Sequence, residues 1–118
     1  MSHNMILNCF NINYFLDFGN GYCVEMPSDK KDLDKLLDYL FSQKVEWKFY
    51  ATLTGRKWFH GIYITFKNRK HLEVTSIMKD ICMILKIDSY CLCENYTQSI
   101  IDIEGDVIAF ADFSEKQE

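Results

Sequence analysis

The chain has 118 residues, of which 48% are hydrophobic and 15% aromatic, and it carries a formal net charge of −4. One proline and five glycines leave no room for long linkers, and the composition excludes intrinsic disorder, so we expect a single domain over 1–118. No apolar run approaches the roughly 20 residues that cross a bilayer, and the N-terminus does not have the pattern of a secretion signal. We therefore expect a cytoplasmic protein with reduced cysteines, because its five cysteines cannot form a complete set of disulfides.

Residues 5–17 are the first predicted element, and their pattern leaves strand and helix open. Apolar residues alternate with asparagines, which favours a strand with one wetter face, since asparagine is a poor residue for a helix interior. The Gly-Asn-Gly sequence at 19–21 tolerates positive φ and predicts a tight turn. A second strand is then expected over 22–26.

Two amphipathic helices are predicted, one on each side of a central hairpin. The first begins after Pro27, where Ser28 or Asp29 can accept hydrogen bonds from the first amide groups, and it ends near Lys44. The second is expected over 69–85. Apolar residues recur at helical spacing in both segments, so each helix has one face to bury.

The strongest pattern in the chain lies in 45–66. Apolar residues alternate there on both sides of a glycine-containing turn, which is typical of an antiparallel hairpin. After the second helix we expect a strand over 90–94 and a closing hairpin over 99–103 and 107–113. The polar tail, 114–118, is expected to fray.

The resulting order, β-β-α-β-β-α-β-β-β, indicates an α+β fold. Each helix needs an apolar surface, and the simplest arrangement is one mostly antiparallel sheet with both helices packed on one face. The order β-α-β-β-α-β over 22–94 is compatible with a ferredoxin-like core. A sheet with one open face would also allow a homodimer.

Charge is divided unevenly along the chain, and this division is the main indication of a partner. Residues 44–86 carry nine bases and three acids, whereas 87–118 carry eight acids against Lys116 alone. We expect the acidic C-terminal hairpin to bind a protein with a basic surface, although acidic residues also protect exposed strand edges from pairing. The predicted contacts are four acids and one aromatic anchor: Asp102, Glu104, Asp106, Asp112 and Tyr96.

Motifs of common enzymes are missing from the sequence. It contains no phosphate-binding loop, dinucleotide fingerprint, nucleophile elbow or paired-carboxylate motif, so we expect a non-catalytic protein without a cofactor. The hypothesis is a small acidic inhibitor, of the immunity or anti-defence type, that occludes a nucleic-acid-handling enzyme such as a toxin or nuclease. The first alternative is a nucleic-acid-binding module that uses the basic residues Arg56, Lys57, Lys67, Arg69 and Lys70.

His60 is the centre of a second alternative, a small enzyme or ligand-binding domain. It shares an alternate set of positions with Trp58, and Tyr63 lies nearby in sequence. General acid–base chemistry would need a second titratable group, and Glu46 on the neighbouring predicted strand is the nearest acid.

Cys91 and Cys93 raise the question of a metal site. A single residue separates them, whereas zinc-binding cysteine pairs are usually separated by roughly two to four residues. The sequence therefore predicts buried thiols at these positions and no metal site.

Overall fold

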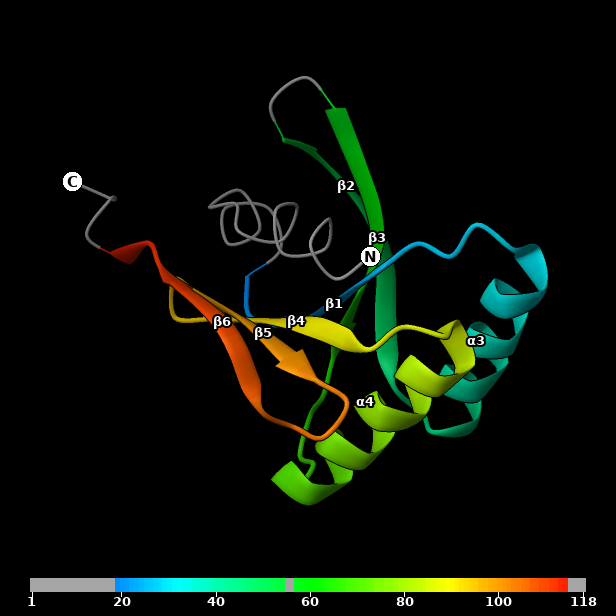
Figure 1. Cartoon of the computed structure of the whole chain (residues 1–118). Helices are drawn as coiled ribbons and strands as arrows, with labels where there is room; N and C mark the ends of the chain where they lie inside the picture. The colour runs from blue at the N-terminus through cyan, green and yellow to red at the C-terminus, as the bar shows by residue number, and fades with distance from the viewer. Residues whose placement is uncertain (1–18, 55–56, 115–118) are drawn as a thin grey trace.

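The computed structural model describes residues 19–54 and 57–114, which fold into a six-stranded sheet and two helices (Figure 1). The elements in chain order are β1 (Gly21–Glu25), α3 (Lys30–Ser42), β2 (Glu46–Thr54), β3 (Lys57–Thr65), α4 (His71–Leu85), β4 (Ser89–Glu94), β5 (Thr97–Asp102) and β6 (Val107–Asp112). The predicted α+β class is confirmed. The element predicted over 5–17 and the last residues of the tail, 115–118, lie outside the described residues.

The described strands follow the order β2-β3-β1-β4-β5-β6, and all neighbours are antiparallel. β1 lies between β3 and β4, although it precedes both in sequence. Each helix therefore joins two strands that are separated by one intervening strand, which is the connectivity of split β-α-β units. The ferredoxin-like core stays an interpretation of this connectivity.

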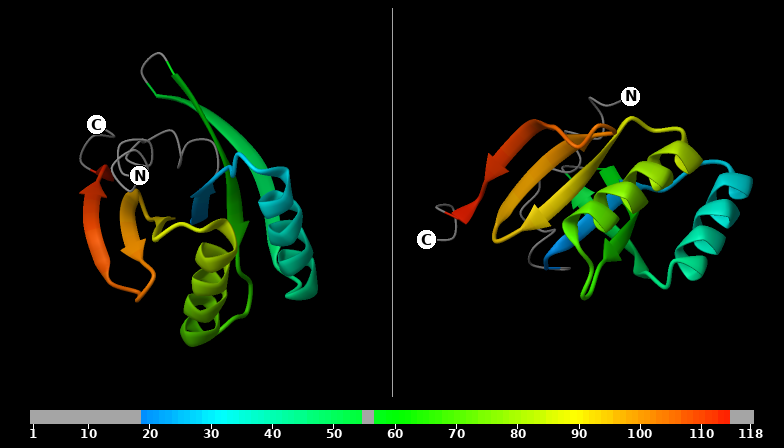
Figure 2. Two further views of the ribbon diagram at one scale, coloured as in Figure 1. Left: turned by 45° about the vertical axis from the view of Figure 1, so that its right-hand side comes forward. Right: turned by 90° about the horizontal axis from the view of Figure 1, so that it is seen from below.

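Both helices cover one face of the sheet, as Figure 2 shows. Their apolar stripes meet β1 and β3 in a continuous core. Burying one aliphatic side chain of this kind contributes roughly 1.5–3 kcal/mol. The fully buried members of the core include Leu36 and Leu40 of α3, Met78 and Ile81 of α4, and Val24, Ile62 and Ile64 of the sheet.

The helix ends follow local chemistry. Asp29 caps α3 as predicted, because its carboxylate accepts a hydrogen bond from the Lys31 amide at 2.9 Å. α4 begins at His71, two residues later than predicted, and its N-cap residue Lys70 makes no capping hydrogen bond with its side chain. Neither α3 nor α4, the two helices of the described chain, has the length and apolar composition needed to cross a membrane.

The face of the sheet opposite to the helices is also buried over β1, β3 and β4. Cys23 lies directly opposite Tyr63 on one side and Cys91 on the other, and at most 1% of each side chain is exposed. Gly61 is required on this face, because a Cβ there would lie 2.5 Å from the Tyr50 hydroxyl oxygen. These side chains are buried in the single chain.

Candidate functional site

The hairpin predicted to bind a partner is formed by β5 and β6, at one edge of the described sheet (Figure 1). β6 pairs with β5 and with no other described strand. Three of its large apolar side chains are exposed: Val107 by 59%, Ile108 by 51% and Phe110 by 59%. Such a group of apolar side chains on an edge strand is typical of a surface that a protein partner covers.

The turn between β5 and β6 carries three of the predicted acids. Asp102 Oδ1 accepts hydrogen bonds from the amides of Glu104 and Asp106, both at 2.9 Å, so this half-buried carboxylate shapes the turn. Glu104 and Asp106 are exposed, and neither forms an ion pair with a described residue. Their negative charges are therefore directed to solvent beside the exposed side chains of β6.

The other two predicted contacts lie at the far end of the hairpin. Asp112 pairs with Thr97, and hydrogen bonds from the Ser114 hydroxyl and amide lower the pKa of its carboxyl group. Tyr96 lies in the turn before β5 and is 41% exposed. The predicted five residues thus form two groups, separated by the length of a six-residue strand, about 17–20 Å.

The alternative basic patch is also divided. Lys67, Arg69 and Lys70 follow the end of β3, whereas Lys57 is at its beginning and Arg56 lies outside the described residues. Along the nine residues of β3 the two ends are about 30 Å apart. The structure therefore brings together three of the five predicted bases.

Two of these three bases already have partners. Lys67 Nζ lies 3.2 Å from a carboxylate oxygen of Glu46. The Arg69 guanidinium donates to the Gln43 carbonyl and lies 4.0 Å from the Glu73 carboxylate. These contacts reduce the positive potential that a phosphate backbone would meet.

The residues of the His60 alternative do not converge. His60 and Trp58 are exposed on one face of the β2–β3 hairpin, whereas Tyr63 is buried on the opposite face. Glu46 pairs with Thr65, five positions along β3 from His60, and is engaged by Lys67. His60 does not line the hollow of about 380 Å³ beside Gln43 and Arg69, or the hollow of about 350 Å³ beside Asn20 and Phe66.

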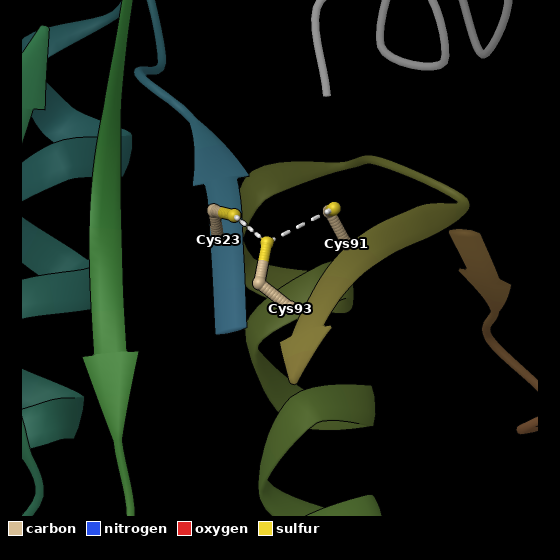
Figure 3. A group of neighbouring side chains, drawn as sticks. All are labelled: Cys23, Cys91 and Cys93. Carbon is tan, nitrogen blue, oxygen red and sulfur yellow. Dashed lines mark hydrogen bonds between the residues drawn. The ribbon is translucent and has the colours of Figure 1, made fainter. Parts of the chain in front are cut away.

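A cluster of three cysteines was not predicted. Cys23 of β1 and the pair Cys91 and Cys93 of β4 point toward one another on the buried face opposite the helices (Figure 3). The Cys93 Sγ lies 3.8 Å from the Sγ of Cys23 and 3.8 Å from that of Cys91. All three sulfur atoms lie within 4.8 Å of one another and are fully buried, which agrees with the prediction of buried thiols.

Polar groups surround this cluster. Hydrogen bonds with Cys23 and Cys91 hold the pKa of the Cys93 thiol below its ordinary value, and a hydrogen bond with Gln98 acts in the same direction. Gln98 lies opposite Cys93 on β5 and is fully buried. Burial is the main cause that raises the pKa of Tyr63 far above its ordinary value, and its hydroxyl donates to the Gly19 carbonyl.

Two arrangements therefore stand out in the described chain: the exposed acidic edge at β6 and the buried thiol cluster between β1 and β4. The edge was indicated by the charge pattern of the sequence, whereas the cluster depends on strand pairing. No family model, curated protein or solved structure matches this chain.

Proposed function

We propose that this chain is a non-catalytic protein-binding protein, an acidic inhibitor of the immunity or anti-defence type that occludes a nucleic-acid-handling enzyme in the cytoplasm. One observation carries the proposal. Edge strand β6 presents three exposed apolar side chains directly after a turn whose Glu104 and Asp106 carboxylates form no ion pair with the described residues.

This edge combines two components of a tight protein interface. Val107, Ile108 and Phe110 supply apolar area, and burying the exposed half of each against a partner would contribute roughly 1 kcal/mol. The acids add complementarity to a basic surface and speed the encounter with it. Enzymes that handle nucleic acid present such basic surfaces to phosphate groups, so the hairpin would compete with the nucleic acid for the same side chains.

The contact set of this proposal differs from the five residues suggested by the sequence. Asp102 is assigned to shaping the turn, because it is half-buried and holds two backbone amides. Asp112 and Tyr96 lie at the other end of the hairpin and are peripheral contacts. The proposed centre consists of Glu104, Asp106, Val107, Ile108 and Phe110.

The cytoplasmic location belongs to the same proposal. The four described cysteines form no disulfide with one another, and all four are buried. Reduced thiols are the usual state in a compartment with a glutathione or thioredoxin system.

The test is capture of a partner by the full-length chain from a nuclease-treated lysate, at low and moderate salt. The double variant Glu104→Lys/Asp106→Lys is compared with Asp34→Lys/Asp38→Lys, which makes the same charge change on exposed positions of α3. We expect a partner with a basic surface to bind the wild type and the α3 variant, and to associate with the hairpin variant roughly tenfold more slowly or worse.

Two results would contradict the proposal. Equal association rates for the two double variants would remove the hairpin from the interface. Recovery of nucleic acid, or loss of all captured protein on nuclease treatment, would favour the basic residues after β3 instead.

A further inference from the structure

We propose that Cys23, Cys91 and Cys93 form a buried site for a thiophilic metal ion, with Cu(I) favoured over Zn(II). The ligands come from two adjacent strands of the sheet, and the site is independent of the protein-binding edge at β6.

The spacing of the sulfur atoms fits a shared ion. Thiolates bind Zn(II) at about 2.3 Å, so two thiolates on one tetrahedral ion lie about 3.8 Å apart, and on a trigonal ion about 4.0 Å apart. Two of the three separations are 3.8 Å, and the third is at most 4.8 Å. Small rotations of the side chains would bring all three sulfur atoms to equal distances from one ion.

The backbone holds the ligands on one face. Cys23 and Cys91 are direct cross-strand partners, and Cys93 follows Cys91 by two positions, so the period of the strand directs all three side chains the same way. β1 and β4 lie in the interior of the sheet, with neighbours on both sides. Ligands on such strands are positioned more rigidly than ligands on loops.

Two buried polar side chains lie beside the cluster. Gln98 is fully buried next to Cys93, and Tyr63 is buried next to Cys23. Polar groups that hydrogen-bond to metal ligands fix their orientation and tune their basicity.

The number of ligands favours Cu(I). Structural zinc sites are almost always four-coordinate, and among the described residues the cluster offers three cysteines and no histidine or carboxylate. Soft thiolate sets select Cu(I) and Zn(II) over harder ions, and a three-thiolate set satisfies Cu(I) without a further ligand. The burial of the sulfur atoms would exclude water and oxidants from the ion.

The test uses the full-length chain, reduced and freed of metal under anaerobic conditions. Cu(I) and Zn(II) are titrated separately against competing chelators, with thiolate-to-metal charge-transfer absorption as the readout. We expect one Cu(I) ion per chain and weaker binding of Zn(II). Each of three single variants should weaken Cu(I) binding by more than roughly 100-fold: Cys23→Ser, Cys91→Ser and Cys93→Ser. Losing a residue that only hydrogen-bonds to a metal ligand costs up to roughly 100-fold, so a larger loss identifies a direct ligand.

Two cysteines serve as controls. Cys82→Ser should leave the affinity unchanged, because Cys82 is buried among core residues of α4 on the helix-covered face. Cys9→Ser asks whether the fifth cysteine contributes, since Cys9 lies outside the described residues. Loss of binding in Cys82→Ser, or full binding in Cys93→Ser, would overturn the assignment.

A measurement on the wild type covers the case in which a serine variant does not fold. X-ray absorption of the copper-loaded chain should show a first shell of sulfur atoms only, at least three in number. A first shell with fewer than three sulfurs, or no uptake of either metal by the folded chain, would overturn the proposal and leave the cluster as three thiols that hydrogen-bond to one another.

Discussion

The two hairpins at the edges of the described sheet differ in how they use their charges. On the β2–β3 side, Glu46 and Lys67 neutralise each other, and Lys48 Nζ lies 5.9 Å from the centre of the Tyr63 ring. On the β5–β6 side, Glu104 and Asp106 form no ion pair with any residue that the structure describes. The charges at one edge are paired within the chain, whereas the two acids at the other edge form no ion pair with a described residue.

The apolar residues of the two hairpins show a related difference. Phe49 and Trp58 are exposed by 52% and 59%, but Phe49 contacts Trp47, with ring centroids 4.9 Å apart. The three exposed side chains of β6 follow one another along a single strand beside the acidic turn. Exposure alone therefore does not distinguish the two edges, and the proposed interface is the edge that combines exposed apolar side chains with unneutralised charge.

The largest loss of stability is expected from Gly61→Ala, which should weaken the packing of the β2–β3 hairpin against β1. A Cβ at this position would lie 2.5 Å from the Tyr50 hydroxyl oxygen and 2.6 Å from the Val24 carbonyl oxygen, so the strands must move apart. We expect a loss of about 3 kcal/mol in the free energy of unfolding. Urea denaturation measures this loss. An unchanged denaturation midpoint would mean that Gly61 does not pack as closely against Tyr50 and Val24 as described.

A second change separates binding from stability. Phe110→Ala should weaken partner binding by about 2 kcal/mol, roughly thirtyfold, while the stability of the free chain changes by less than about 0.5 kcal/mol. Phe49→Ala is the matched control, because Phe49 is similarly exposed at the opposite edge. Titration calorimetry with the captured partner should show reduced affinity for Phe110→Ala and not for Phe49→Ala. Equal losses of affinity in both variants would mean that the interface does not centre on β6.

An alanine substitution in the β5–β6 turn should reduce stability less than Gly61→Ala does. Gly105 has a φ of +93°, and a Cβ there would meet only the Thr75 Cγ2 atom, at 3.7 Å. The cost of Gly105→Ala is therefore conformational, about 1 kcal/mol. In thermal unfolding, the melting temperature of Gly61→Ala should lie well below that of Gly105→Ala. The reverse order would contradict the close packing described for Gly61 in β3.

The smallest effect is expected from the ion pair on the β2–β3 side. Lys67 and Glu46 keep 72% and 65% of their side-chain surface exposed, so solvent screens their attraction. Glu46→Gln should change the unfolding free energy by less than about 0.5 kcal/mol. A clear gain in nucleic-acid binding by this variant, measured by fluorescence anisotropy, would show that Glu46 masks a functional base and would weaken the contrast between the edges.

The succession of elements could be predicted from the sequence because local signals encode it. Asp29 caps α3 through a contact two residues away, and the apolar stripes of both helices follow from spacing along one segment. The acidic turn was also visible as a run of charge. What the sequence lacked was the role of Asp102, which depends on the turn conformation.

Strand pairing explains most of what could not be predicted. Cys23 meets Cys91 and Cys93 because β1 pairs with β4, and no periodicity within either segment records this. Alternation in β3 placed Tyr63 and His60 on opposite faces, but both faces are buried where β3 pairs with β1, as fully buried Ile62 shows for the face of His60. Tyr63 is buried and His60 is exposed, because the nine-residue strands β2 and β3 extend beyond the five-residue β1 (Figure 1).

The central place of β1 has a consequence for synthesis on the ribosome. Each hairpin joins neighbouring segments and can close within roughly 1–10 μs of its emergence. β1 leaves the ribosome before β3 and β4, the two strands between which it must insert, so its pairing waits for most of the described chain. The three-cysteine cluster therefore cannot form until Cys93 has left the ribosome, so any ion it binds must arrive after most of the described chain has been made.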